Sequence, residues 1–210
     1  MSSDISHIII PDCDLQQFEK IASANPRSLR MNLIEGLLKI MPVHNKYSEQ
    51  ELGIITQVGI WKDANKNLVG RCTSSRGAFR LLNLENPNNP DKPTVLGPDV
   101  AVVLKYRWDT FSDYEKDMSY PPISPNFVVE LRSPSDSSQY VHKKMKLWVE
   151  AGVEEAISID TIANPPEVRI YTLNPDTNRV GWQTQASPTQ VVSQVLPGFV
   201  LDMQQIYEIQ

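Results

Sequence analysis

The segment Ser124–Gly152, SPNFVVELRSPSDSSQYVHKKMKLWVEAG, carries the clearest structural signals in the chain. Phe127–Val129 is a short apolar run that includes β-branched valines, and such a run predicts a buried strand. Glu130 places a charge in that strand, at a position where an apolar residue is expected. Pro134 ends the strand, and the serines and aspartate after it offer N-caps for a helix that carries three lysines.

A second carboxylate has a similar setting upstream. Asp99 follows Pro98 and directly precedes the apolar run Val100–Val103, which also predicts a buried strand. Burying an unpaired carboxylate is costly, so acids of this kind are usually paired or bound to a metal. Two hard oxygen ligands suit Mg²⁺ or Mn²⁺, especially when a phosphate completes the shell. A nearby lysine would complete an arrangement that cleaves phosphodiesters.

These residues resemble the PD-(D/E)XK nuclease superfamily. More closely, they resemble a large bacterial family of restriction endonucleases first catalogued as a domain of unknown function. The matching strings are GPDVAVV at 97–103, FVVELRSPSD at 127–136, KM at 144–145 and LPGFVLD at 196–202. In order and spacing they indicate a nuclease core over roughly residues 27–207. The resemblance implies an α/β fold with a mixed β-sheet core flanked by helices and with additional N- and C-terminal strands.

The resemblance also implies roles for individual residues. Asp99 and Glu130 would hold Mg²⁺ or Mn²⁺, with the backbone carbonyl of Leu131 as a third ligand. Lys144 would orient the attacking water or stabilise charge on the phosphorus. In the wider superfamily the lysine often stands two residues after the acid, which is the position of Arg132 here. The resemblance therefore implies that the catalytic lysine has moved onto the helix.

Helical geometry independently selects Lys144 among the three lysines. At about 100° per residue, Lys144 lies beside the apolar face of the predicted helix, whereas Lys143 and Lys146 point away from it. We expect these two to contact substrate phosphates or to belong to a solvated face. Arg132 stays protonated and cannot act as a base, so it either binds phosphate or faces solvent.

Two further positions bear on the metal site. Many relatives have an acid where this chain has Asn32, and an amide there weakens the site if that acid binds metal. Glu51 stands on a predicted helix, Ser48–Lys62, whose apolar stripe would include Leu52, Ile55, Val58 and Trp61. The resemblance implies that an acid on this helix, Glu51 or Glu49, can be an additional metal ligand. The alternative for Glu51 is a capping box with Ser48.

Hydrophobic periodicity and turn residues predict the other elements. The predicted elements are a helix at 11–24, a hairpin at 29–41 turning at Glu35-Gly36, two strands within 67–82, an exposed loop at 84–97, a short helix within 107–122, a strand at 156–160, a hairpin at 168–184, and closing strands at 196–201 and 203–207. We expect the short helix to pack on the core or to lie over the site. We expect the hairpin at 168–184 and the closing strands to extend the main sheet and to offer a dimer contact.

Composition predicts an ordinary globular protein with one domain, 1–210. The chain is 40% hydrophobic and 21% charged, and it is long enough to bury a sizeable core. It contains neither an apolar run long enough to span a bilayer nor a signal-peptide pattern, so we expect a cytoplasmic protein without membrane contact. Cys13 and Cys72 fit no metal-ligand spacing; we expect reduced thiols, with a disulfide as the alternative.

The net charge of the chain narrows the classes of function that suit it. A net charge of −5 does not suit a nonspecific DNA-coating protein, which is usually basic, although a local basic cluster on the lysine helix can still contact DNA. The leading hypothesis is a metal-dependent DNA endonuclease that works as a homodimer, because each chain has one site for two strands. One alternative is a catalytically inactive nucleic-acid-binding protein on a nuclease fold. The other is purely structural, with Glu130 and Lys144 as a buried ion pair and Asp99 as a turn cap.

Overall fold

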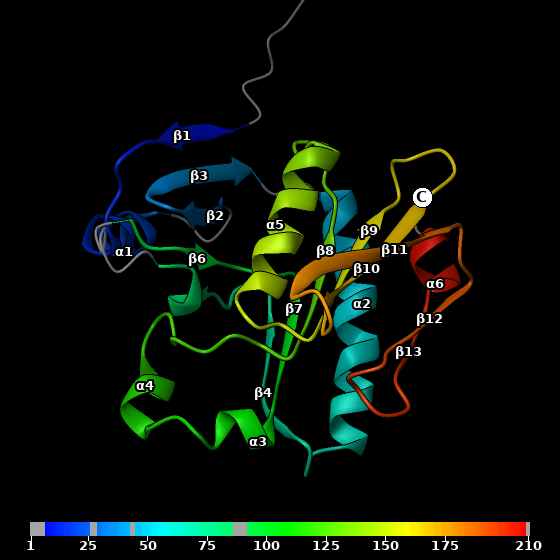
Figure 1. Ribbon diagram of the computed structural model, residues 1–210. Helices are drawn as coiled ribbons and strands as arrows, with labels where there is room; N and C mark the ends of the chain where they lie inside the picture. Colours follow the sequence, from blue (N-terminus) through cyan, green and yellow to red (C-terminus); the bar gives the residue numbers. More distant parts are fainter. Residues whose placement is uncertain (1–6, 26–28, 43–44, 86–91, 209–210) are drawn as a thin grey trace, which may run out of the picture.

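A computed structural model describes residues 7–25, 29–42, 45–85 and 92–208. The strands of these residues form a six-stranded sheet, a five-stranded sheet and a two-stranded ribbon. Figure 1 shows the first at the centre, the second beside it near the N-terminus and the ribbon near the C-terminus. Helices cover both faces of the central sheet. The predicted fold class, a mixed sheet flanked by helices with further strands toward both termini, is confirmed.

The six-stranded sheet contains both acids of the predicted site. Its strands, in spatial order, are β11 (Arg179–Ala186), β10 (Glu167–Asn174), β9 (Glu155–Asp160), β8 (Phe127–Leu131), β7 (Val100–Leu104) and β4 (Val69–Ser74). The β8–β9 pair is parallel and the other neighbours are antiparallel. Parallel neighbours need a crossover connection, and helix α5 (Ser138–Glu150) supplies it between β8 and β9.

The two faces of the central sheet are covered by different helices. Val100 and Val102 of β7 share a core cluster with helix α2 (Asn45–Ala64), whereas Ala101 and Val103 share a second cluster with α5. Alternate residues of one strand thus pack against opposite layers. Burial on both faces explains why β7 and β8 are continuous apolar runs rather than alternating ones.

The five-stranded sheet is built around the predicted N-terminal hairpin. Its strands, in spatial order, are β1 (Ile8–Ile10), β3 (Leu37–Pro42), β2 (Leu29–Ile34), β6 (Val95–Leu96) and β5 (Phe79–Arg80). Glu35 and Gly36 form the turn with φ of 51° and 79°, the positive values that a type I′ hairpin requires. The predicted loop at 84–97 is wrong at its end, because Val95 and Leu96 form a buried strand; residues 86–91 lie outside the described part.

The remaining helices are short. They are α1 (Leu15–Ala24), the 3-10 helix η1 (Leu82–Leu84), α3 (Lys105–Trp108), α4 (Asp113–Asp117) and α6 (Gln204–Tyr207). Asp14 caps α1 by accepting from the backbone N–H of Gln17 at 2.7 Å. The helix predicted within 107–122 is two short helices that follow the far end of β7, away from Asp99, and so does not cover the predicted site.

The prediction for α2 is wrong in two details. The helix begins at Asn45, so Ser48 lies inside it and the predicted capping box is absent. Leu52 is 60% exposed, whereas Val58 and Trp61 of the predicted stripe are buried together with Ile54. The buried face is thus rotated about the helix axis, which leaves Glu51 buried on the sheet side and Glu49 exposed.

The prediction for the closing strands is also wrong. β12 (Gln190–Val192) and β13 (Val200–Asp202) pair with each other and do not extend the main sheet, and residues 204–207 form the helix α6. The reason is packing, because Leu201 and Ile206 join the core cluster on the α2 side of the sheet. Gln57 of α2 also bonds the backbone of Asp202 in both directions, at 2.7 and 3.0 Å.

Two further predictions concern cysteines and membranes. Cys13 and Cys72 are both free, as expected. Among the described residues, no helix combines the length and the apolar character needed to cross a membrane.

Candidate active site

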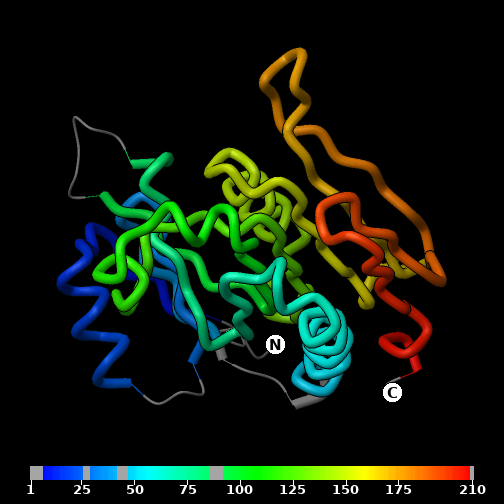
Figure 2. Tube along the Cα trace, turned by 90° about the horizontal axis from the view of Figure 1, so that it is seen from below, coloured from blue at the N-terminus to red at the C-terminus, as the bar shows by residue number. Residues whose placement is uncertain are grey.

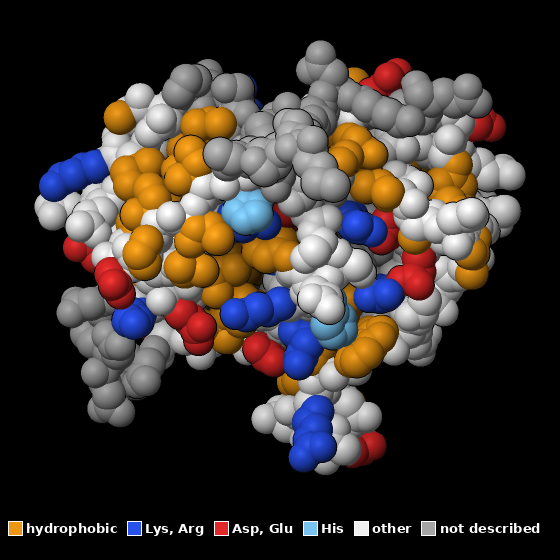
Figure 3. Space-filling view, turned by 90° about the horizontal axis from the view of Figure 1, so that it is seen from above, with side chains coloured by type: hydrophobic (Ala, Val, Ile, Leu, Met, Phe, Trp, Pro, Cys, Tyr) orange, Lys and Arg blue, Asp and Glu red, His pale blue; other side chains and the backbone are white. Residues whose placement is uncertain are grey.

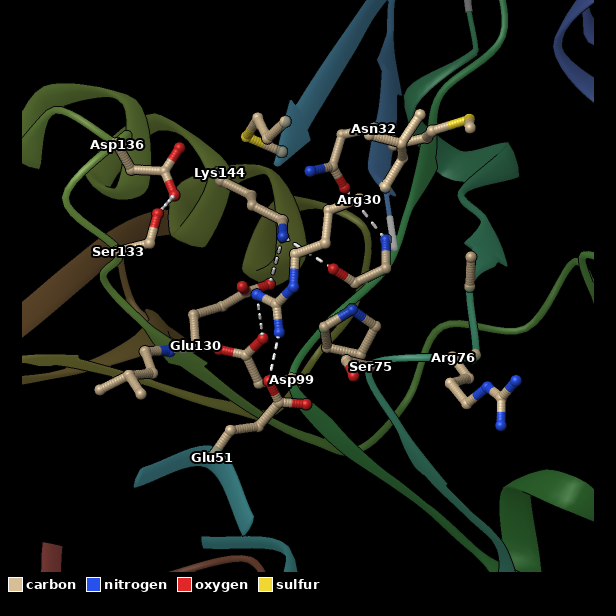
Figure 4. A pocket seen from close by; sticks show the side chains of 18 of the residues that line it. Arg30, Asn32, Glu51, Ser75, Arg76, Asp99, Glu130, Ser133, Asp136 and Lys144 are labelled. Atoms are coloured by element: carbon tan, nitrogen blue, oxygen red, sulfur yellow. Dashed lines mark hydrogen bonds and ion pairs between the residues drawn. The ribbon is translucent and has the colours of Figure 1, made fainter. Parts of the chain in front are cut away.

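The register of two antiparallel strands brings the predicted acids together. Val100 of β7 pairs with Val129 of β8, so Asp99, one residue before, stands beside Glu130, one residue after. The backbone N–H of Asp99 donates to Val129 at 3.1 Å. Leu131 returns the contact by donating its N–H to Oδ2 of Asp99 at 2.5 Å. Asp99 and Glu130 line the same cavity, as a shared metal site requires (Figure 4).

Helix α5 delivers two donors to Glu130. Lys144 Nζ and Trp148 Nε1 lie 2.7 and 3.0 Å from the same oxygen, Oε1. They are four residues apart and therefore on one face of the helix. Lys144 also donates to the carbonyl oxygen of Gly97 at 2.7 Å, which ties the helix to the loop before Asp99. The lysine is 5% exposed, and helical geometry predicted this inward orientation.

Burial is the main influence on the pKa of Glu130. The carboxyl is 5% exposed, and burial raises its pKa to about 7. The ammonium of Lys144 opposes this rise, and the negative charge of Asp99 adds to it. Glu130 therefore titrates near neutral pH.

Arg30 is a residue that the sequence did not single out for the site. It comes from β2 of the other sheet, and its guanidinium lies between two acids (Figure 4). Nη2 is 2.5 Å from Oε2 of Glu51, and Nη1 forms an ion pair with Oδ1 of Asp99. Burial lowers the pKa of Arg30, but the carboxylates of Asp99, Glu51 and Glu130 outweigh it and hold the pKa above its ordinary value. The sequence did hold a signal, since Arg30 stands two residues before Asn32, on the same strand.

Glu51 lies at the site from the α2 side. It lines the cavity, and its pKa is raised by burial and by the charge of Asp99. The guanidinium of Arg30 and a hydrogen bond from Ser75 oppose that rise. The structure thus brings a third carboxylate to the same cavity. From the sequence alone, Glu51 was either a metal ligand or a capping residue.

Asn32 is a structural connector. Its Oδ1 accepts from the N–H of Gly97 at 3.1 Å, and its Nδ2 donates to the hydroxyl of Tyr140 at 3.2 Å. The buried amide therefore joins β2 to α5 and to the segment that precedes Asp99. A carboxylate at this position could accept from Gly97 but could not donate to Tyr140.

The three predicted substrate contacts lie apart from the acids. Arg132 pairs with Asp160 at 2.6 Å and donates Nε to the carbonyl of Asp136 at 3.0 Å. It follows the last residue of β8, so the alternation of the strand no longer directs it toward the cavity. Lys143 is exposed and Lys146 is half-buried on α5. Within the described chain, none of these three cations lines the cavity of the acids.

The cavity itself is about 920 Å³ in volume. Besides the acids, Arg30 and Lys144, its wall includes Leu131 and the exposed Arg76, which stands on the turn between β4 and β5. This volume lies near the upper end of the range for small-molecule sites. The cavity therefore has room for a phosphodiester together with its neighbouring sugars.

The carboxylate oxygens of Asp99, Glu130 and Glu51 suit a hard divalent cation, although they are not arranged around one point. Among residues 7–25, 29–42, 45–85 and 92–208, no group of three His, Cys, Asp or Glu is spaced as a ready metal site. Oδ1 of Asp99 is buried without a well-aligned hydrogen bond, its neighbour being the ion-paired Arg30. With Glu130 and Glu51 it forms an oxygen-rich wall of the kind that Mg²⁺ and Mn²⁺ prefer.

Comparison with known families identifies the chain. The model of the Uma2 family, described as "Putative restriction endonuclease", matches residues 15–204. The chain belongs to the Uma2 family. This confirms the resemblance inferred from the strings around Asp99 and Glu130, and it supports a nuclease function.

A solved structure supports the fold. The Uma2 chain is similar to a crystal structure described as a putative nuclease belonging to DUF820 from Anabaena variabilis, with a TM-score of 0.66. The sequences are 17% identical, and the alignment covers 92% of this chain and 97% of the other. At this identity the likeness shows a shared fold. No curated protein matches the chain.

Glu130→Gln should remove a pH-dependent loss of stability from this Uma2 protein. Because the pKa of Glu130 is raised to about 7 from an ordinary 4.5, the folded state keeps a proton that the unfolded chain releases. The stability from this group is complete below about pH 4.5 and is lost as the pH rises through about 7. Urea unfolding between these pH values, with a chelator present, should show a larger loss of unfolding free energy in the wild type. Equal losses in both proteins would contradict the burial argument.

Proposed function

We propose that this chain is a divalent-metal-dependent DNA endonuclease that hydrolyses phosphodiester bonds. Membership of the Uma2 family supports a nuclease. The observation that carries the finer proposal is the convergence of Asp99, Glu130 and Lys144 on one cavity. These residues come from three separate segments, and each is the residue that the resemblance selects.

Each residue has a distinct role in this proposal. Asp99 and Glu130 hold Mg²⁺ or Mn²⁺, assisted by the carbonyl of Leu131 and by Glu51. The ion supplies Lewis acidity toward water and the scissile phosphate. The ammonium of Lys144, held by Glu130 and by the carbonyl of Gly97, orients the attacking water or stabilises the charge that develops at phosphorus.

Basic residues outside the cavity provide the contacts to flanking DNA. Figure 3 shows Lys and Arg side chains close together on the face seen from above. Lys146 and Arg169 act electrostatically on His142, and the exposed Lys143 stands next to it on α5. Arg76 offers a further cation at the wall of the cavity. Such a local cluster binds phosphates although the chain as a whole is acidic.

The structural alternative also has a specific observation in its favour. Glu130 and Lys144 form the buried ion pair that it predicts, and Asp99 accepts a backbone hydrogen bond from Leu131. These contacts can hold the fold together without a metal, as they would in an inactive nucleic-acid-binding protein. Calorimetric titration with Mn²⁺ separates the hypotheses, because a purely structural cluster has no specific site.

We also propose that the chain forms one domain and lies in the cytoplasm. Residues 1–210 form a single nuclease-like domain, since Ile34 and Leu96 of the five-stranded sheet share a core cluster with Val103 of the six-stranded sheet. We propose a cytoplasmic location on the basis of the two free cysteines, because disulfides are rare in that compartment.

A homodimer through β11 accounts for the cutting of two strands. The two edges of the six-stranded sheet differ. On β4 the pairing shifts between Val69 and Arg71, and Arg71 lies over the ring of Trp108 at 4.7 Å, so this edge is irregular and partly covered. β11 pairs with β10 over eight consecutive residues, contains neither Pro nor Lys, and has no strand on its outer side within the described chain.

Long edge strands that are neither irregular nor covered are templates for pairing with another chain. A second copy of β11 is the natural occupant, because antiparallel pairing about a two-fold axis satisfies both edges at once. Figure 2 shows the β10–β11 hairpin projecting from the body of the molecule, where another chain can approach it.

Lys144→Ala should lower turnover by about 10²–10³-fold while leaving metal affinity largely intact, because its charge acts in the transition state. Plasmid cleavage with Mg²⁺ or Mn²⁺ measures the rate, and calorimetry measures metal binding. Glu130→Ala should abolish metal binding and cleavage together. The matched controls, Lys143→Ala and Lys146→Ala, should cleave normally at saturating DNA and show salt-dependent loss of DNA affinity. A Lys144→Ala protein as fast as the wild type would refute the role of this lysine.

Two lysines introduced on β11 should separate the dimer into single chains. Light scattering at micromolar concentration should give twice the 23.7 kDa chain mass for the wild type and the single mass for a Gln183→Lys/Thr184→Lys variant. Both side chains are exposed, so the fold should survive. Gln16→Lys, on the exposed side of α1, should remain dimeric. A wild-type protein of single mass would disprove the dimer.

A further inference from the structure

Arg30 occupies the position beside Asp99 and Glu51 that a divalent cation bound to these acids would also need. Its guanidinium contacts Glu51 at 2.5 Å and ion-pairs with Asp99, and both acids belong to the proposed metal site. The side chain is 28% exposed, so it is closely held yet reaches the cavity that the acids line. Arg30 belongs to β2 in the five-stranded sheet, whereas Asp99 stands at the start of β7 in the six-stranded sheet.

Charge balance in the cavity makes this contact consequential. Asp99, Glu51 and Glu130 face the two cations Arg30 and Lys144. The other charged residues of the wall are Asp136, which pairs with Lys39, and the exposed Arg76. Lys144 is engaged with Glu130 at 2.7 Å, so Arg30 is the counter-ion of the other two acids. A guanidinium stays protonated at any pH the protein tolerates, and it can leave the acids only by moving. A divalent ion on Asp99 would lie close to this charge and be repelled by it.

We propose that Arg30 is a resident counter-ion that competes with the divalent cation for Asp99 and Glu51, and that it moves to the substrate phosphate when metal and DNA bind together. This inference rests on the proposed nuclease function. A guanidinium matches two oxygens of a phosphate as well as it matches carboxylates. The exchange therefore replaces one set of charge-assisted hydrogen bonds with another of the same kind.

The consequence is a thermodynamic coupling between metal and substrate. Metal alone has to displace Arg30 without offering it a new partner, so it binds weakly. A phosphodiester accepts the displaced guanidinium, so each ligand raises the affinity of the other by the same factor. Metal is thereby held firmly only when a phosphate is in the cavity.

The experiment measures Mn²⁺ binding to the intact protein by calorimetry, with and without a thymidine dinucleotide that carries one phosphodiester. Arg30→Met keeps an unbranched side chain and removes the charge. It should bind Mn²⁺ alone at least about tenfold more tightly than the wild type, and the dinucleotide should no longer raise that affinity. Lys39→Met is the matched control on the neighbouring strand β3, because Lys39 pairs with Asp136 at 3.1 Å instead of with the three acids.

A measurement on the wild type covers the case in which Arg30→Met does not fold. Nitrogen-15 NMR of arginine side chains, with the Arg30 signal assigned from Arg30→Lys, should change strongly when Mg²⁺ and the dinucleotide are added together. An Arg30 signal that is unchanged under these conditions would overturn the inference.

The outcomes also separate this inference from the proposed function. If Arg30→Met binds Mn²⁺ no more tightly than the wild type, while Glu130→Ala loses binding, Arg30 is a structural link and the metal site stands. If no protein binds Mn²⁺ and Glu130→Ala changes nothing, both proposals fail.

Discussion

The burial of Glu130 within β8 is the constraint on which the site depends. A carboxylate that is 5% exposed needs partners, and α5 supplies Lys144 and Trp148 to the same oxygen. Delivering both donors sets the rotation of the helix over the sheet. Since α5 is also the crossover that makes β8 and β9 parallel, one buried charge links the topology of the sheet to the chemistry of the cavity.

The site stands where the two sheets meet, and polar contacts join them there. Asn32 of β2 bonds the N–H of Gly97, and Arg30 of the same strand pairs with Asp99. Holding several charges in a half-buried cavity reduces stability relative to an apolar packing of the same space. Acids with raised pKa values that share one cavity, as Glu130 and Glu51 do, are typical of functional sites.

Local patterns predicted most elements correctly and failed where packing overrode them. The turn at Glu35-Gly36 was found because its residues suit positive φ. The start of α2 was misplaced because Ser48 and Glu51 have capping-box spacing inside a longer helix. The closing strand at 203–207 was predicted from an apolar pattern that serves equally well in α6, where Ile206 packs into the core.

The sequence by itself determined the strands around Asp99 and Glu130 and the choice of Lys144 among three lysines. Apolar runs and helical periodicity are local properties, and they fix which side of an element is buried. The tertiary structure alone decided that Arg30 lies between Asp99 and Glu51, and that Arg132 turns away to Asp160. Such partners are distant in the chain, and they meet only through the order of strands and the register of their pairing.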